Sequence, residues 1–292
     1  MTMLIAHLSD VHIAESGPVQ GQGFDTAAIF EAAVSELNAF EPRPDIVLMT
    51  GDFTDSGTVA EYEVFKQILE KLEIPFHLIP GNHDSHTAMR AVLGELDALG
   101  DDGTFIQHVV DDYPVRLIGL DSTMVGHHSG ELCEKRIAWL DGCLEEARDR
   151  PTALFMHHPP VTTGIWWLDC IGLSQGTEAL EELIGRHRQV KAIFCGHFHR
   201  AIQSTLSGVP VFIAPSIGIA SVLDLRHEGP PRSISEPPAM QFHSWTGASF
   251  VTHTHYVGRN DTVLDWIPLM PNWPVRLELM RNHAPIPKDL GI

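Results

Sequence analysis

The stretch "LIPGNHDSH" (residues 78–86) joins the end of an apolar run to a dense group of polar side chains. A turn needs glycine, and asparagine tolerates the same backbone, so Gly81 and Asn82 fit any loop after a strand. A turn does not need the two residues that follow, His83 and Asp84. Imidazole, carboxylate and amide groups ligate metals, and the first two also move protons. The stretch therefore predicts a buried strand that ends at a chemical site.

Short apolar runs of the same kind recur along the first two-thirds of the chain. Those that indicate buried strands lie at 4–10, 45–52, 76–82, 115–122, 153–159 and 192–197. Apolar residues at helical spacing predict helices between them, at 25–40, 58–72, 85–99, 134–148 and 177–187. Asp25 is placed to cap the first helix. This alternation predicts an α/β fold with a largely parallel sheet covered by helices.

The pattern changes after about residue 205. Three further runs predict strands without helices between them, at 209–216, 248–257 and 262–269. The segment 227–240 is rich in Pro and Ser, which indicates a loop that is either a simple connection or a functional rim or lid.

The composition narrows the classes of partner. The chain has 292 residues, a formal net charge of −19 and 43% hydrophobic residues, as expected of a globular protein with a real core. This charge repels nucleic-acid backbones and anionic membranes, so we expect neither a nucleic-acid polymer nor a membrane as partner. It also disfavours a phosphate-bearing substrate, unless bound cations reverse the sign locally.

The cysteines and the apolar runs bear on the cellular compartment in which the protein folds. Cys133, Cys143, Cys170 and Cys195 form no CxxC pair and no evident disulfide framework. The first residues carry no basic region and no cleavage-like site, and no apolar run reaches the roughly 18 residues of a membrane span. We therefore expect a protein of the reducing cytoplasm.

Ligand-type side chains follow five of the predicted strands. Besides Asn82 they are Asp10, His12, Asp52, His157, His197 and His199. The carboxyl ends of parallel strands share one edge, so we expect these residues to converge at the edge of a single sheet. A lone aspartate or histidine there is usually a turn or cap residue. The same residue types at all these ends argue instead for a site.

The donor set favours two metal ions over one. Two carboxylates, one amide oxygen and four imidazoles exceed the needs of one four-coordinate ion. Two five- or six-coordinate divalent ions can use them all if one carboxylate bridges. Asp52 is the natural bridge because it lies centrally in the order. The mixture of nitrogen and oxygen donors suits iron, manganese, cobalt or zinc better than calcium or magnesium.

Several other stretches keep two interpretations open. His158 is either a structural neighbour of His157 or a substrate contact. The tryptophans of "WWLD" (166–169), Trp166 and Trp167, either pack against the body of the protein or form a pocket wall. The stretch "GHHSG" (126–130) is either a plain turn or a pocket rim. No role is assigned to His243, which follows the Pro-rich segment.

Five polar blocks resemble, in order and spacing, those of the calcineurin-like metallophosphoesterases: Asp10-x-His12, "GDFTDSG" (51–57), "GNHD" (81–84), "MHHPP" (156–160) and "GHFH" (196–199). The resemblance covers about residues 4 to 216. Within the family, the chain looks most like the bacterial class III cyclic nucleotide phosphodiesterases and the glycerophosphodiester phosphodiesterases. The resemblance implies a four-layer α/β/β/α fold, in which a two-sheet mixed β-sandwich is flanked by helices.

The resemblance also implies a domain organisation. A single metallophosphoesterase domain spans 1–292, and its catalytic core, 1–216, carries all the ligand blocks. The remainder, 217–292, supplies strands and a loop that complete the second sheet and form a cap or a subunit contact. Relatives of this kind are often dimers or larger assemblies, which implies a homo-oligomer.

Carried over residue by residue, the resemblance implies two metal sites. One uses Asp10, His12, Asp52 and His199, and the other uses Asp52, Asn82, His157 and His197. His83 matches the catalytic histidine of the family, and Asp84 is expected to orient it. The cofactors are then two divalent ions, with iron and manganese ahead of zinc and cobalt.

These residues imply a dinuclear metal-dependent phosphodiesterase, in which a metal-bridging hydroxide attacks phosphorus in line. His83 stabilises the phosphoryl oxygens or protonates the leaving alkoxide. The acidic chain favours small diesters, such as cyclic nucleotides or glycerophosphodiesters. One alternative is a phosphomonoesterase or phosphoprotein phosphatase, which the lack of an obvious arginine for a dianionic monoester disfavours. Another is a non-catalytic scaffold on the same fold, which the intact ligand set disfavours.

Overall fold

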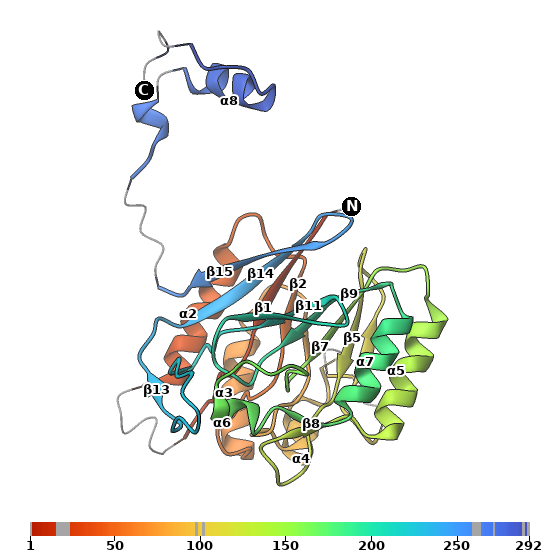
Figure 1. Ribbon diagram of the computed structural model, residues 1–292. Helices are drawn as coiled ribbons and strands as arrows, with labels where there is room; N and C mark the ends of the chain where they lie inside the picture. The colour runs from red at the N-terminus through yellow and green to blue at the C-terminus, as the bar shows by residue number, and fades with distance from the viewer. Residues whose placement is uncertain are drawn as a thin grey trace. The chain divides into compact units, whose positions relative to one another are not determined.

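The computed structural model describes residues 2–15, 24–96, 99–100, 103–258, 264–270, 272–287 and 290. The chain divides into two compact units, Met1–Gly258 and Arg259–Ile292, and each is described by itself. The larger unit contains two mixed β-sheets with helices packed against them (Figure 1). The boundary between the two units lies near residue 258, whereas the sequence suggested a division at residue 216.

The first sheet holds the N-terminal strand and the two late strands of the larger unit. Its order is β15-β14-β1-β2-β3, with bounds Phe250–Tyr256, Ala239–Trp245, Met3–Leu8, Ile46–Met49 and Phe76–Leu78. Strands β1, β2 and β3 are parallel, whereas β14 is antiparallel to both of its neighbours. The late strands β14 and β15 of the segment 217–292 thus extend the sheet that contains β1.

The second sheet has the order β10-β11-β9-β7-β5-β4, with bounds Ile202–Leu206, Val209–Ile213, Val190–Cys195, Thr152–Met156, Arg116–Leu120 and His108–Val110. Its four central strands are parallel, and both edge strands are antiparallel to their neighbours. Two small ladders lie outside the main sheets, and they pair Gly130–Glu131 (β6) with Leu173–Gln175 (β8), and Ala220–Ser221 (β12) with Ser233–Ile234 (β13).

The helices cover the outer faces of the two sheets. Residues of α2, α3 and α4 share one core cluster with Ala6 and Leu8 of β1, while residues of α5 and α7 join a second cluster that includes Ile5 and the second sheet. Because side chains alternate along a strand, β1 faces the helices with one set and the second sheet with the other. The result is the expected four-layer arrangement, visible in Figure 1.

The predicted helices are confirmed with shorter bounds: Thr26–Ala39 (α2), Val59–Leu69 (α3), His86–Leu93 (α4), Glu134–Glu146 (α5) and Thr177–Arg186 (α7). The largest difference is at α4, which ends at Leu93 where the sequence predicted a helix to residue 99. A further short helix, α6, spans Trp166–Asp169. The Asp25 side chain accepts a hydrogen bond from the Ala28 amide, as predicted for the N-cap of α2. Ser85 caps α4 in the same way, so that helix begins at His86, the last residue of the stretch "LIPGNHDSH".

Two strand assignments need correction. Of the run 262–269, residues 264–269 are described, and they form a 3₁₀ turn at Ile267–Leu269 (η1) rather than a strand. The segment 227–240 includes the two residues of β13, and it ends where β14 begins, a strand that the sequence pattern did not identify. The alternation in β14 is hidden because nearly all of its residues are buried, so no polar face marks it.

The smaller unit contains η1 and the helix α8 (Trp273–Arg281). Several of its apolar side chains are exposed, including Trp266, Ile267 and Leu269. Within the described part of the whole chain, no helix combines the length and the apolar character that crossing a bilayer requires.

Candidate metal centre

The predicted ligands lie where five strands end, but those strands belong to two sheets. Asp10, His12, Asp52 and Asn82 follow strands of the first sheet, and His157, His197 and His199 follow strands of the second. The expectation of one sheet edge is therefore wrong. The parallel strands of two facing sheets bring their carboxyl ends together instead, as the hydrogen bond from the His197 amide to the Asp10 carboxylate shows (3.0 Å).

The backbone at these ends is unusual. Five candidate ligands have positive φ angles between 50° and 71°: Asp10, His12, Asp52, His197 and His199. A non-glycine residue in this region costs about 1–3 kcal/mol, and such strain collects at functional sites. The fold therefore holds these side chains in positions that an ordinary turn does not require.

Two glycines permit the close approach of the ligand loops. Gly51 has a φ of 89°, and a Cβ atom there would lie 2.5 Å from the Gly81 nitrogen. A Cβ atom on Gly81 would lie 2.2 Å from the Asp52 carboxylate. The glycine that precedes each of Asp52 and Asn82 is thus required by packing, which explains the "GD" and "GN" pairs in the sequence.

The first cluster contains Asp10, His12, Asp52 and His199, with their ligand atoms within 4.8 Å of one another. The Nε2 atoms of His12 and His199 are 3.1 Å apart. His12 Nε2 lies 3.5 Å from Asp52 Oδ2, and His199 Nε2 lies 3.4 Å from Asp10 Oδ1. This is the set predicted for one of the two metal sites.

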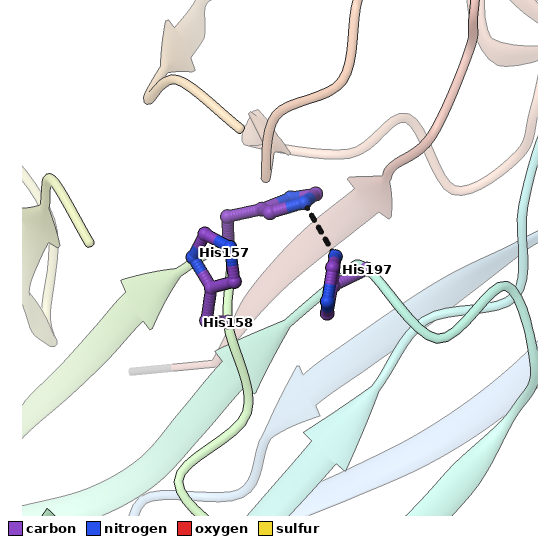
Figure 2. Close-up of side chains that lie close together, drawn as sticks. All are labelled: His157, His158 and His197. Carbon is purple, nitrogen blue, oxygen red and sulfur yellow. Dashed lines mark hydrogen bonds between the residues drawn. The ribbon is translucent and has the colours of Figure 1, made fainter. Parts of the chain in front are cut away.

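The second cluster shares Asp52 with the first. His157 Nε2 lies 3.3 Å from Asp52 Oδ2 and 3.1 Å from Asn82 Oδ1. The same nitrogen is 3.1 Å from Nδ1 of His197, the contact drawn as a dashed line in Figure 2. The structure therefore brings together all seven predicted ligands, with the Asp52 carboxylate between the two sets.

Each of these histidines has an inner ring nitrogen, which faces the cluster, and an outer ring nitrogen, which faces away from it. The partners of the outer nitrogens fix the tautomers. Nδ1 of His157 lies 2.6 Å from the Thr50 carbonyl, and Nε2 of His197 lies 2.8 Å from the Ile171 carbonyl. Nδ1 of His199 lies 2.7 Å from the Ile219 carbonyl. A carbonyl oxygen only accepts, so each of these nitrogens carries hydrogen. The inner nitrogens are then the ones that carry lone pairs when the rings are neutral.

This pattern fits bound cations. In their neutral forms, His157 and His197 would point two lone pairs at each other across 3.1 Å. Such a contact needs either a proton or a cation between the atoms. The donors around it are imidazole nitrogens, carboxylates and one amide oxygen, which together suit divalent transition metals.

Electrostatics around Asp52 agree with a cation site. Burial favours the neutral form of Asp52, but the imidazoles of His157 and His12 hold the pKa of this carboxyl well below its usual range. Burial lowers the pKa of His157, yet the carboxylates of Asp52 and Asp10 outweigh that effect and raise it to about 9. The metal-free site thus holds a negative carboxylate and at least one proton that a metal would displace.

His83 lies beside the first cluster, and its ring contacts that of His12 edge-on, with centroids 4.7 Å apart. Its Nδ1 lies 2.7 Å from the backbone carbonyl of Asp55, so this nitrogen donates. Asp84 was expected to orient the ring, but its carboxylate accepts from the Tyr62 hydroxyl (2.7 Å) and the Gly81 amide (2.9 Å) instead. Asp84 therefore ties the "GNHD" loop to α3, and Asp55 holds His83.

His158 is enclosed by structural contacts. Its Nδ1 pairs with the Ser122 hydroxyl (2.9 Å), and its Nε2 donates to the His128 carbonyl (3.1 Å). Its ring lies next to His157 and His197, as Figure 2 shows. Both nitrogens are thus occupied, which favours the structural interpretation over a substrate contact.

A cavity of about 370 Å³ opens beside the two clusters. Besides candidate ligands and His83, it is lined by His128, Trp167, Ile171 and residues of the β12–β13 ladder. Trp167 therefore forms part of the pocket wall, and "GHHSG" contributes to its rim, whereas Trp166 is 42% exposed. His128 also lies 3.4 Å from the Asn82 amide nitrogen.

Sequence reasoning missed the groups that hold the ligands in place. Asp55 lies within the quoted "GDFTDSG" block, and its position three residues after Asp52 was the available signal. The carbonyls of Thr50, Ile171 and Ile219 left no signal, because any residue offers a carbonyl.

Comparison with known proteins identifies the family. A sequence profile described as "Calcineurin-like phosphoesterase" matches residues 3–201, more than half of the chain. The chain belongs to the calcineurin-like phosphoesterase family. All seven candidate ligands and His83 lie within the matched range of this calcineurin-like phosphoesterase. The family uses divalent metal ions, in agreement with the donor set.

Curated relatives cover most of this calcineurin-like phosphoesterase. It is 37% identical over 258 residues (88% of this chain, 94% of the relative) to the probable glycerophosphodiester phosphodiesterase GpdQ of Arcobacter nitrofigilis. It is 34% identical over 236 residues (79% and 84%) to a probable cyclic nucleotide phosphodiesterase of Rhodopseudomonas palustris. It is 28% identical over 212 residues (73% and 75%) to the 3',5'-cyclic adenosine monophosphate phosphodiesterase CpdA of Escherichia coli.

Solved structures show the same fold. A dimetal phosphatase from Danio rerio superposes with a TM-score of 0.60 at 16% identity, over 86% of this chain and 98% of that one. A purple acid phosphatase from yellow lupin gives a TM-score of 0.64 at 13% identity, over 90% and 52%. At these identities the likeness establishes the mixed two-sheet architecture and nothing finer.

Proposed function

We propose that this protein is a dinuclear metal-dependent phosphodiesterase that hydrolyses small phosphodiesters. One observation carries the proposal: the buried Asp52 carboxylate lies between two sets of inward-facing imidazoles, 3.5 Å from His12 and 3.3 Å from His157. That arrangement is costly without cations and favourable with two of them. The names of the curated relatives, which are diesterases, support a diester as substrate.

Two sets of residues would hold the ions. Asp10, His12, Asp52 and His199 would form one site, and Asp52, Asn82, His157 and His197 the other. A bound pair of divalent ions supplies an activated water nucleophile and neutralises charge on the phosphoryl oxygens. Residues 1–216 remain, in this proposal, the catalytic core.

The remaining chemistry falls to this chain's own groups. With Nδ1–H of His83 donating to the Asp55 carbonyl, Nε2 has no hydrogen-bond partner among the described residues, and in the imidazolium form it carries the second hydrogen, which it can give to the leaving alkoxide or donate to a phosphoryl oxygen. Tyr62 and Asp84 keep the loop that carries His83 against α3. The pocket volume of about 370 Å³ suits a small diester, such as a cyclic nucleotide or a glycerophosphodiester.

The proposal extends to the cofactors, the assembly and the compartment. The mixed nitrogen and oxygen donors support iron or manganese, with zinc or cobalt as alternatives. The exposed apolar side chains of the smaller unit support a homo-oligomer. Four cysteines without a disulfide support the cytoplasm, and the charge of −19 argues against nucleic-acid polymers and anionic membranes as partners.

The decisive test compares a diester with a monoester. Metal-stripped protein is assayed with bis(p-nitrophenyl) phosphate and with p-nitrophenyl phosphate, before and after Mn²⁺ or Fe²⁺ is restored. We expect metal-dependent turnover of the diester and its loss in Asn82→Ala. Asn38→Ala is the matched control, because Asn38 binds backbone groups of Lys71 and Glu73, outside the residues that line the pocket.

Each outcome has a definite meaning. Diester turnover that Asn82→Ala loses and Asn38→Ala keeps supports the proposal and justifies a panel of cyclic and glycerol diesters. A strong preference for the monoester would make the protein a phosphomonoesterase. Bound metal without turnover of either compound would favour a non-catalytic role for the same fold.

A further inference from the structure

A chain of buried hydrogen bonds crosses the interior between the two sheets. His7 on β1 and His243 on β14 are both 0% exposed, and His7 Nδ1 lies 3.2 Å from His243 Nε2. At one end, His243 Nδ1 pairs with the Thr252 hydroxyl on β15 (2.8 Å). At the other end, His7 Nε2 pairs with the Thr50 hydroxyl (2.9 Å). The four residues form one continuous polar path, which we call the histidine relay.

The relay lies among apolar neighbours. The His243 ring stacks on Phe194 with centroids 4.1 Å apart, and Phe212 lies 5.4 Å away. Burial lowers the pKa of His7 to about 3, so this ring stays neutral near pH 7. Leucine or phenylalanine would fill the same space without polar atoms that need partners. Packing alone therefore does not explain two imidazoles at this place.

Thr50 connects the relay to the candidate metal centre. Its carbonyl accepts from Nδ1 of His157 at 2.6 Å, and its amide donates to the Leu8 carbonyl at 3.0 Å. The same segment has two further restraints: the Ser9 hydroxyl donates to the Thr50 carbonyl (3.2 Å), and the Asp10 amide donates to the carbonyl of Gly51 (3.1 Å). The hydroxyl bond to His7 holds Thr50 from its other side. The relay thus restrains the carbonyl that fixes the tautomer of His157.

We propose that His7, His243 and Thr50 are positioning residues, which hold His157 with its Nε2 directed toward Asp52, Asn82 and His197, the residues that would share a cation with it. This inference rests on the proposed metal centre. Outer groups that orient a metal-bound histidine typically contribute 10–100-fold in metal affinity. Among the described residues, the candidate ligand that Thr50 holds through its carbonyl is His157, which belongs to one of the two sets, so we expect the effect to fall mainly on that site.

The test measures metal binding rather than activity. Thr50→Val removes the hydroxyl but keeps the shape and the carbonyl, and Thr50→Ser keeps the hydroxyl. Titration of metal-free protein with Mn²⁺ by calorimetry, and with Co²⁺ by visible absorption, gives the affinity of each site. We expect Thr50→Val to weaken one site about 10–100-fold and to leave the other within about threefold, while Thr50→Ser restores wild-type affinity.

Two further variants separate positioning from stability. Thr252→Val cuts the relay at its far, partly exposed end, and it should weaken the same site in the same direction. Ile68→Val trims the core beside α3, away from the relay, and should lower stability without changing either affinity. Equal weakening of both sites in all variants would overturn the inference, as would wild-type affinities in Thr50→Val.

Wild-type protein that binds no Mn²⁺ or Co²⁺ would overturn the proposed metal centre and the relay's role with it. Wild-type protein that binds two ions, with Thr50→Val unchanged, would overturn the relay's role alone. The two failures are therefore distinguishable.

Discussion

Two pairs of imidazoles lie at almost the same separation in this molecule, one in the interior between the sheets and one at the strand ends. His7 Nδ1 and His243 Nε2 are 3.2 Å apart, and His157 Nε2 and His197 Nδ1 are 3.1 Å apart. All four side chains are buried. Distance and burial therefore do not distinguish the two pairs.

The outer nitrogens distinguish them. In the interior pair, these nitrogens meet the hydroxyls of Thr50 and Thr252, which can donate or accept. One ring can then donate a hydrogen bond to the other, and both nitrogens of each ring have a partner. In the strand-end pair, the outer nitrogens meet the carbonyls of Thr50 and Ile171, which only accept. Both inner nitrogens are then acceptors, and only a proton or a cation satisfies them.

The largest expected effect comes from removing the charge at the strand-end pair. Asp52→Asn takes away the carboxylate shared by both clusters, so both ions should be lost. We expect kcat/KM for bis(p-nitrophenyl) phosphate to fall about 1,000-fold or more, because several kcal/mol of Lewis-acid stabilisation disappear. Kinetics and metal analysis of the purified variant check this. Wild-type turnover and metal content in Asp52→Asn would contradict it.

The pH dependence of metal loading follows from the proton at the strand-end pair. Neighbouring carboxylates outweigh burial and raise the pKa of His157 to about 9, so below that pH a metal must displace its proton. We expect the apparent Mn²⁺ affinity to fall about tenfold per pH unit as the pH drops from 9 to 7. Calorimetry in buffers of different ionisation enthalpy measures the released protons. An affinity that does not change with pH would argue against this exchange.

The interior pair should make the protein sensitive to acid. Burial lowers the pKa of His7 to about 3 and that of His243 well below its usual value. In the unfolded chain the two histidines have the ordinary pKa of about 6.5, so below that pH they bind protons that they do not bind in the folded chain. This part of the stability is fully present above about pH 6.5 and is lost as the pH falls below it, for His7 by about 1.4 kcal/mol per pH unit until the pH reaches about 3, and for His243 in the same direction.

A double variant isolates this contribution. His7→Gln with His243→Gln keeps groups that hydrogen-bond but cannot titrate. Urea unfolding of metal-free protein between pH 7 and pH 4 should show a smaller loss of unfolding free energy in this variant than in wild type. Parallel pH profiles of the two proteins would show that the interior pair does not contribute.

The smallest effect is expected at a third histidine environment. His187 Nε2 lies 3.0 Å from Asp141 and 3.7 Å from Glu145, a set that resembles a metal site by composition. However, the Gln189 amide donates to His187 Nδ1, so Nε2 carries the hydrogen and offers no lone pair. Asp141→Asn should leave two bound ions and change the unfolding free energy by less than about 1 kcal/mol. Loss of an ion in Asp141→Asn would contradict the argument that the partner of a histidine's other ring nitrogen decides whether that histidine can bind a cation.

Much of the fold follows from local patterns in the sequence. The apolar runs predicted β1, β2, β3, β5, β7 and β9, and the helical spacing predicted α2, α3, α4, α5 and α7. These elements follow from periodicity because each has a buried face and a recognisable end. The short strands were not predicted. Strand β14 was not predicted either, because a strand with nearly all residues buried shows no alternation of polar and apolar residues.

The sequence also determined which residues assemble at the strand ends. Asp10, Asp52, Asn82, His157 and His197 each follow an apolar run, and a carboxyl end is where such residues meet. Tertiary structure alone decided that two sheets, and not one, supply them. Sheet membership depends on pairing between distant strands, which no local pattern records.

Tertiary structure also decided which groups hold the site residues. Asp84 follows His83 directly, yet its carboxylate binds Tyr62 while the Asp55 carbonyl holds the His83 ring. His7 and His157 are 150 positions apart in the sequence, yet Thr50 contacts both. Adjacency along the chain does not set the direction of a side chain, and a backbone carbonyl has no residue identity to read. The residue types in the sequence determined which chemistry is possible, and the packing of the two sheets determined which groups form hydrogen bonds with the site residues.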